Sequence, residues 1–119
     1  MTYDVVSIDF HGTVKDIIEK IQKTHHDGFP VVEGDEVVGY VSARDLLFVQ
    51  LTTPVKEVVS TNLIVADPEM DINDAARVIF RSGIQKLPVV DEKNHLLGII
   101  SNSDVIRSQI EHVSPEKVF

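Results

Sequence analysis

The chain has 119 residues, a formal net charge of −8 and no cysteine. This length suits one compact domain or two small lobes with a common core. The 11 Lys and Arg residues are scattered singly, which argues against nucleic acid as a partner, and the absence of cysteine excludes disulfides and thiolate metal sites. No apolar run approaches the roughly 18 residues of a membrane span, and the N-terminus lacks a signal-peptide pattern. We expect a cytoplasmic location, with no membrane and no nucleic acid among the partners of this segment.

The first part of the chain predicts a strand, a helix and a hairpin of two strands. Val5–Ile8 is a short apolar segment that suits a strand. A helix follows it, with Thr13 where an N-cap is expected and Gly28 where a helix should stop. The apolar residues of one helical face are Val14, Ile17, Ile18 and Ile21. The hairpin strands are Phe29–Glu33 and Val37–Ser42, both apolar nearly throughout, as in strands covered on two faces.

A second helix is predicted directly after Ser42. The segment Asp45–Leu51 is apolar around more of a helix than one core face requires, and Pro54 should end it. An exposed surplus of this kind marks an interface, so we expect a homodimer. The residues expected at this interface are Leu46, Leu47, Phe48, Val49 and Leu51, together with Val105, Ile106 and Ile110 of the second half.

The second part of the chain repeats the same order of elements. A strand is predicted at Ile64–Ala66, and a helix follows between an N-cap at Asp71 and a stop at Gly83. The apolar face of this helix comprises Ile72, Ala75, Ala76, Ile79 and Phe80. The predicted hairpin pairs Leu87–Asp91 with Leu96–Ser101, and another helix should open after the serine.

The repetition extends to single residues. Pro30 and Pro88 are 58 residues apart, whereas Gly39 and Gly98 are 59 apart, so one extra residue falls in the second hairpin turn. Each copy is a βαββα unit that would bury too little surface alone. The predicted fold is therefore of the mixed α/β (α+β) class, with two βαββα repeats packed sheet to sheet around a pseudo-two-fold axis.

The predicted boundaries follow from this order. Residues 1–53 form the first repeat, 54–62 a linker, 63–113 the second repeat and 114–119 the start of a C-terminal extension. Ser114–Glu116 has the pattern of a helix start, with proline at the first helical position. We therefore expect a C-terminal effector domain in the full-length chain, whose activity this segment would regulate.

The unit βαββα, with Pro-Val-Val after an apolar residue and with Gly, two apolar residues and Ser-x-x-Asp at its end, occurs twice. It resembles the CBS domain, and the tandem resembles a CBS pair, or Bateman module, over essentially the whole chain. The resemblance implies a non-catalytic, energy-sensing regulatory module that binds AMP, ADP, ATP or S-adenosylmethionine in clefts between the repeats. The alternative is a structural dimerisation module that binds no ligand. Catalytic motifs are absent from the sequence, and we expect no metal site and no other cofactor.

The repeated Ser-x-x-Asp motif has two readings. Ser42 and Ser101 stand where a strand becomes a helix, and Asp45 and Asp104 stand three residues later, so each pair could form a capping box. The resemblance to CBS pairs instead implies that each aspartate binds the vicinal hydroxyls of a ribose, for which a charged acceptor is well suited. One side chain can do both, so the two readings remain open.

The resemblance also implies which residues surround each ligand. The Asp45 site would take Ser42, Arg44, Asn62, Ile64, Ile84 and Gln85. The Asp104 site would take Ser101, Ser103, Lys86, Val6, His26 and Asp27. Arg44 and Lys86 would meet a phosphate, whereas core packing is the competing reading for the apolar residues. Because Asp27 adds negative charge to the second site, we expect a phosphorylated ligand to fill the Asp45 site first.

Overall fold

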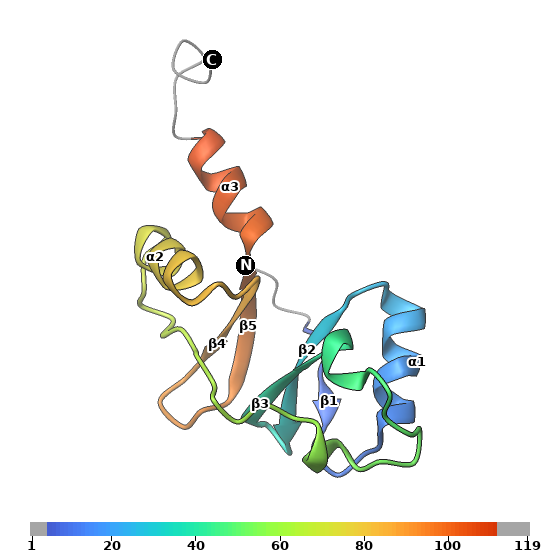
Figure 1. Ribbon diagram of the computed structural model, residues 1–119. Helices are drawn as coiled ribbons and strands as arrows, with labels where there is room; N and C mark the ends of the chain where they lie inside the picture. The colour runs from blue at the N-terminus through green and yellow to red at the C-terminus, as the bar shows by residue number, and fades with distance from the viewer. Residues whose placement is uncertain (1–4, 112–119) are drawn as a thin grey trace. The chain divides into compact units, whose positions relative to one another are not determined.

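The computed structural model describes the backbone of residues 5–111, and Figure 1 shows the order of its elements. The helix start predicted at Ser114–Glu116, the C-terminal extension and the side chain of Ile110 lie outside the described residues. The chain divides into two compact units. Unit 2 comprises Val6–Leu63 and Lys93–Leu96, and unit 1 comprises the remaining described residues. Among residues 5–111, no helix combines the length and apolar character that a membrane crossing requires.

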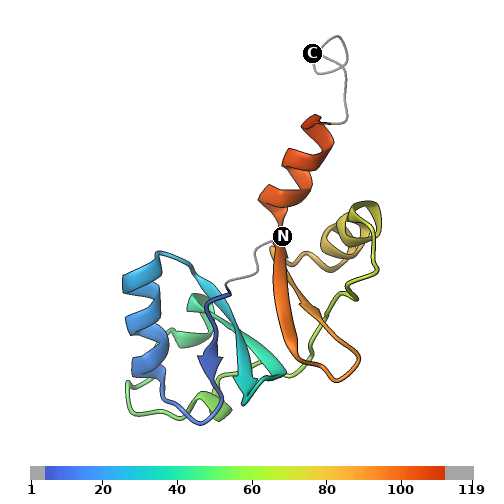
Figure 2. The ribbon, with the colours of Figure 1, turned by 180° about the vertical axis from the view of Figure 1, so that it is seen from behind.

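Unit 2 is built on a three-stranded sheet. Its strands are β1 (Ile8–Asp9), β2 (Gly28–Glu33) and β3 (Glu36–Ser42), in the order β1-β2-β3. β1 and β2 are parallel, and β2 and β3 form the predicted antiparallel hairpin. The helix α1 (Val14–Thr24) runs beside β1 in both views (Figures 1 and 2). β1 (Ile8–Asp9) begins later than the strand predicted at Val5–Ile8.

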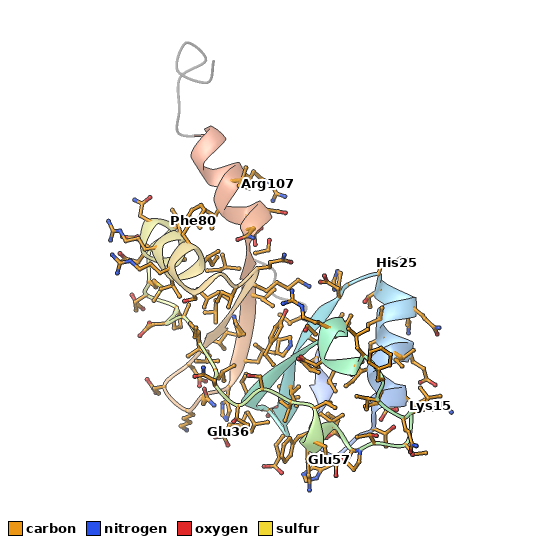
Figure 3. The ribbon with its side chains drawn as sticks, in the orientation of Figure 1. Lys15, His25, Glu36, Glu57, Phe80 and Arg107 are labelled. Carbon is orange, nitrogen blue, oxygen red and sulfur yellow. The ribbon has the colours of Figure 1, made fainter. Side chains whose placement is uncertain are left out.

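The ends of α1 show one confirmed prediction and one wrong one. Thr13 precedes the helix as predicted, and its backbone N–H donates to the Asp16 carboxylate at 2.9 Å. The helix ends at Thr24 rather than near Gly28, because His25 adopts a left-handed backbone with φ of 61°. Figure 3 labels His25 at this end of α1. His25 and His26 thus follow the helix instead of lying on it, and Gly28 opens β2.

One hydrophobic core holds unit 2 together. Its buried members come from β1, α1, the hairpin and the segment after Pro54, and they are Ile8, Ile17, Phe29, Val31, Val41 and Val55. Burying each of these side chains stabilises the fold by about 1.5–3 kcal/mol. The predicted linker is therefore part of this core through Val55, which is completely buried.

The second helix of the first repeat is much shorter than predicted. Only a 3-10 helix, η1 (Ala43–Leu46), follows β3, and Phe48 has a left-handed backbone with φ of 63°. The backbone carbonyls of Leu51 and Thr53 accept hydrogen bonds of 3.0 and 2.8 Å from the first N–H groups of α1. Those N–H groups have no partner inside their own helix, so they draw the chain out of a helical path.

Unit 1 contains a two-stranded sheet and two helices. α2 (Ile72–Ser82) is followed by β4 (Lys86–Val90), β5 (Leu96–Ser101) and α3 (Asn102–Glu111). The caps of α2 are as predicted: Asp71 accepts from the Asp74 N–H at 2.8 Å, and Gly83 has φ of 68°. The strand predicted at Ile64–Ala66 is reduced to a single bridge between Ala66 and Val89.

The core of unit 1 includes residues from every one of these elements. Its buried members are Ala66, Ala75, Ala76, Ile79, Leu87, Val89, Ile100 and Val105. Val105 is 2% exposed, so its predicted place in a dimer interface is wrong, whereas the neighbouring Ile106 is 53% exposed. In the described part of α3, the apolar residues therefore divide between the core and the surface.

The turn between β4 and β5 belongs to unit 2 because of its backbone hydrogen bonds. The Val37 N–H donates to the Asn94 carbonyl at 2.9 Å, and the Leu96 N–H donates to the Asp35 carbonyl at 3.2 Å. Glu36 and His95 form the antiparallel bridge between these bonds. The turn that contains the extra residue of the second copy is thus hydrogen-bonded to the hairpin of β2 and β3.

Gly39 permits a close approach of the Ser60 backbone to β3. The Ser60 N–H and carbonyl pair with the backbone of Tyr40, and a Cβ added to Gly39 would lie 2.6 Å from the Ser60 oxygen and against Val59. We expect Gly39→Ala to lower the free energy of unfolding by about 1–3 kcal/mol, because the Ser60 backbone and the Val59 side chain must shift to make room for the added methyl group. Urea denaturation measures this. Glu36→Ala, on an exposed part of the same strand, is the control, and equal stability of the two variants would contradict the packing argument.

Candidate functional site

The first Ser-x-x-Asp motif forms a closed turn at the end of β3. The Asp45 Oδ2 atom accepts hydrogen bonds from the Ser42 backbone N–H at 2.8 Å and from its hydroxyl at 3.1 Å. The next residue, Ala43, donates its N–H to the Asp27 carbonyl at 2.7 Å. The predicted capping role of Asp45 is confirmed, and the turn is tied to the segment just before β2.

The second motif reproduces this turn in unit 1. The Asp104 Oδ2 atom accepts from the Ser101 N–H at 2.9 Å and from the Ser101 hydroxyl at 3.2 Å. The Asp104 N–H in turn donates to the Ser101 hydroxyl oxygen at 3.3 Å. Asn102 donates its N–H to the Gln85 carbonyl at 3.0 Å, which corresponds to the bond between Ala43 and Asp27. The duplication has therefore preserved both the carboxylate closure and the backbone bond beside it.

The two carboxylates differ in their surroundings. The Asp104 side chain is only 16% exposed, and its Oδ1 atom lies 3.8 Å from a guanidinium nitrogen of Arg107. Asp45 is exposed, and within the described part of the chain no basic nitrogen lies within 4.0 Å of its carboxylate. Figure 3 shows Arg107 on the side of α3. The sequence analysis did not single out Arg107, although its position three residues after Asp104 was a signal for a contact within the helix.

The remaining residues of the predicted sites are divided between the units. Ser42, Arg44, Asn62, Val6, His26 and Asp27 belong to unit 2, whereas Ser101, Ser103, Lys86, Ile64, Ile84 and Gln85 belong to unit 1. Within each unit, the motif is brought to the segment before the Pro-Val-Val strand. The grouping of Asp45 with residues of unit 1, and of Asp104 with residues of unit 2, stays a prediction.

Burial separates the apolar from the polar candidates. Val6 packs against the core of unit 2, and Ile64 and Ile84 pack against the core of unit 1, which agrees with the core-packing reading. Lys86 is half-buried at the start of β4. The exposed candidates are Arg44, Asn62, His26, Asp27, Gln85 and Ser103. Exposure leaves these polar groups accessible to a ligand.

Tyr40 is a titratable residue near the first turn that the sequence analysis missed. It lies on β3, two residues before Ser42, and its hydroxyl is so close to Gly28 that a Cβ added there would lie 2.5 Å away. Burial, and then the negative charge of Asp27, raise the pKa of Tyr40 from 10.0 to about 12. The corresponding residue of the second copy is Ile99, so the repeat showed this position as merely apolar.

A cavity of about 540 Å³ lies elsewhere in unit 2, against α1 and β1. Its lining mixes acidic and basic side chains with strand residues: Ser7, Ile8, Asp9, Asp16, Glu19, Lys20, Lys23, Val32 and Gly34. None of the predicted site residues lines it. Its charges of both signs select no ligand class, so the two carboxylate turns remain the candidate site.

The chain thus contains two copies of a helix and a strand hairpin, and each copy is closed by a serine–carboxylate turn. The chain belongs to the CBS domain family, whose sequence pattern matches residues 1–51 and 55–111, and it is a CBS pair, or Bateman module. The fold is the mixed α/β fold of CBS-pair structures.

Similar proteins cover nearly the whole chain. Uncharacterized protein MJ0188 of Methanocaldococcus jannaschii is 45% identical over 99% of this chain, which spans 45% of that relative's length. The crystal structure of CBSX2 in complex with AMP has a TM-score of 0.84 at 25% identity, covering 93% of this chain and 92% of that one. The cytosolic domain of the Mg²⁺ channel MgtE in complex with ATP has a TM-score of 0.83 at 26% identity, covering 91% and 46%.

The raised pKa of Tyr40 predicts a measurable alkaline titration. Tyr3→Phe leaves Tyr40 as the only one of the two tyrosines, and tyrosinate absorbance should then rise with a midpoint near pH 12 instead of 10. Because the folded-state pKa is above the unfolded one, Tyr40 favours the folded state fully below about pH 10, and this contribution is lost as pH rises to about 12. Asp27→Asn should lower the midpoint. A midpoint near 10 in a chain that circular dichroism shows to be folded would contradict the burial of the hydroxyl.

Proposed function

We propose that this chain is a non-catalytic sensor that binds an adenosine-containing ligand through Asp45 and Asp104. The observation that carries the proposal is the repeated turn, in which each aspartate is held in place by the serine three residues earlier. A side chain already ordered in the empty protein loses little conformational freedom when a ligand binds. This pre-organisation suits the recognition of a rigid pair of hydroxyls.

The geometry of each carboxylate supports ribose as the recognised group. The Oδ2 atom already accepts two hydrogen bonds from the serine at both turns, through its N–H and its hydroxyl. The serine does not bond to the Oδ1 atom, so Oδ1 is the oxygen that would accept hydrogen bonds from a vicinal diol. Hydrogen bonds to an ionised acceptor are shorter and stronger than those between neutral groups. Capping and ribose binding are therefore compatible uses of one side chain.

The relatives and the charge of the chain support the ligand class that we propose. The related CBSX2 structure contains AMP and the related MgtE domain contains ATP, which supports adenine nucleotides for this chain. The net charge of −8 disfavours a triphosphate relative to AMP or to the cationic S-adenosylmethionine. We propose Arg44 and Lys86 as phosphate contacts, and we propose that a phosphorylated ligand fills the exposed Asp45 site first.

The wider role is regulation of a partner domain. The chain spans 45% of the length of the MJ0188 relative and 46% of the MgtE domain chain, which supports a regulatory segment attached to an effector domain. The MgtE relative is a cytosolic domain, and we propose a cytoplasmic location here too. Ligand binding would shift the effector only to the extent that the two states bind the ligand with different affinities.

A thermal-shift series tests the proposal. The parent protein is heated with AMP, ADP, ATP or S-adenosylmethionine, and a true ligand at a hundred times its dissociation constant should stabilise the fold by about 2.7 kcal/mol. Asp45→Asn and Asp104→Asn should each reduce affinity at their own site by about tenfold to a hundredfold, because a neutral amide replaces a charged acceptor. Isothermal titration calorimetry measures this loss.

Asp71→Asn is the matched control for this series. Asp71 also caps a helix, accepting from the Asp74 N–H at 2.8 Å, but it belongs to neither turn. Asparagine caps a helix about as well as aspartate, so this replacement removes the same charge and should leave ligand affinity unchanged. Equal loss of binding in all three variants, or no shift with any adenosine compound, would argue against the sensor proposal.

One observation favours the alternative of a dimerisation module. In the segment after η1, Leu47 is 65% exposed, Phe48 is completely exposed and Leu51 is 52% exposed. We propose that this segment meets a second copy of the chain, although it forms no long helix. Such a dimer is compatible with ligand binding, and in the absence of binding it would be the remaining function.

Sedimentation tests the dimer. We expect the parent to be dimeric at high micromolar concentration and Phe48→Ser to shift it toward monomer, because the change removes a fully exposed aromatic side chain. Phe80→Ser on α2, where Phe80 is 71% exposed, is the control and should leave the dimer intact. A parent that remains monomeric would refute this expectation.

A further inference from the structure

The two copies of the turn differ at the position three residues after the aspartate. In the second copy this position is Arg107, whose guanidinium lies 3.8 Å from the Asp104 Oδ1 atom. In the first copy it is Phe48, which is fully exposed and follows a broken helix. Among the described residues, the duplication therefore kept the carboxylate in both copies but placed a cation within 4.0 Å of it in one copy alone.

The cation lies at the oxygen that the proposed function requires. The Ser101 N–H and hydroxyl both donate to Asp104 Oδ2, at 2.9 and 3.2 Å. A ribose diol would therefore donate to Oδ1, which is the oxygen that Arg107 approaches. At 3.8 Å the contact is an ion pair without a direct hydrogen bond, so the guanidinium can leave without breaking the turn.

Burial makes this ion pair matter more than an ordinary surface pair. The Asp104 side chain is 16% exposed, whereas that of Arg107 is 68% exposed. Limited access of water to the carboxylate weakens screening of the guanidinium charge. The exposed arginine retains room to move away. The pair is thus strong enough to compete with a ligand and loose enough to open.

We propose that Arg107 is a competing counter-ion that lowers the affinity of Asp104 for ribose and so sets the order in which the two sites fill. The inference rests on the proposed function of the aspartates. Asp45 has no such competitor among the described residues, so its carboxylate is available to a diol at once. Arg107 is a specificity-determining residue that acts through Asp104.

Adenosine is the probe, because a phosphate would attract Arg107 and obscure the competition. In an Asp45→Asn background, which isolates the second site, Arg107→Gln should tighten adenosine binding about twofold to fivefold, as expected for release of a partly exposed ion pair. Arg107→Lys retains the charge and should keep the parent affinity. 2′-Deoxyadenosine, which lacks one hydroxyl of the diol, should show a smaller gain. Isothermal titration calorimetry measures all three.

Arg77→Gln is the matched control. Arg77 pairs with Asp74 at 2.8 Å, also three residues apart on a helix of unit 1, and it is exposed to a similar degree. Its replacement removes the same charge from the protein and should leave adenosine affinity unchanged. Equal gains in Arg77→Gln and Arg107→Gln would reduce the effect to net charge and overturn the inference. Weaker binding in Arg107→Gln would also overturn it, because Arg107 would then be a ligand contact.

A second measurement tests the pair without any ligand. In a double-mutant cycle of Asp104→Asn and Arg107→Gln, the urea midpoints should be non-additive, because each residue stabilises the other. Additive midpoints would overturn the ion pair itself. Non-additive midpoints in a parent that binds no adenosine compound would instead refute the proposed function and the competition that depends on it. The two failures are therefore distinguishable.

Discussion

The bond between an aspartate carboxylate and the N–H of the serine three residues earlier organises each repeat of this protein. It ends the last strand, starts the next helical turn and orders an ionised side chain at the surface of the unit. An adjacent backbone bond, from Ala43 to Asp27 and from Asn102 to Gln85, ties the turn to the segment before the Pro-Val-Val strand. The same local chemistry thus serves stability and, in the function we propose, also orders the group that binds the ligand.

The surroundings of this shared turn have diverged between the copies. Asp104 is largely covered, begins a helix of ten residues and has an arginine one turn away. Asp45 is exposed, lies in a single 3-10 turn and is followed by a run of exposed apolar residues. In the function we propose, the duplicated motif would therefore hold two sites of different affinity. The proposed ligand binding depends on the serine–aspartate turn that the two copies share. The proposed difference in affinity depends on Arg107, which only the second copy has at this position.

Sequence patterns were most reliable where the controlling forces are local. The helical stripes, the caps at Thr13, Asp71 and Gly83, and both hairpins were found because periodicity, capping chemistry and backbone freedom act within a few residues. Gly28 was misread as a helix stop, since a nearby histidine took the left-handed conformation that glycine usually provides. The perturbed pKa of Tyr40 was not predicted, because the tyrosine ring fits the apolar pattern of a buried strand as well as an aliphatic side chain does.

By itself, the sequence determined the duplicated order of elements, the two capping turns and the choice of aspartate as the candidate ligand-binding group. Only the tertiary structure decided how far each second helix extends and which carboxylate is covered. The physical reason is distance along the chain. The first N–H groups of α1 have no partner within that helix, and they bond instead to the carbonyls of Leu51 and Thr53, more than 30 residues later in the sequence. These bonds keep Leu51 and Thr53 out of a helix. The Tyr40 ring likewise lies against Gly28 of the neighbouring strand, a contact that no local pattern contains.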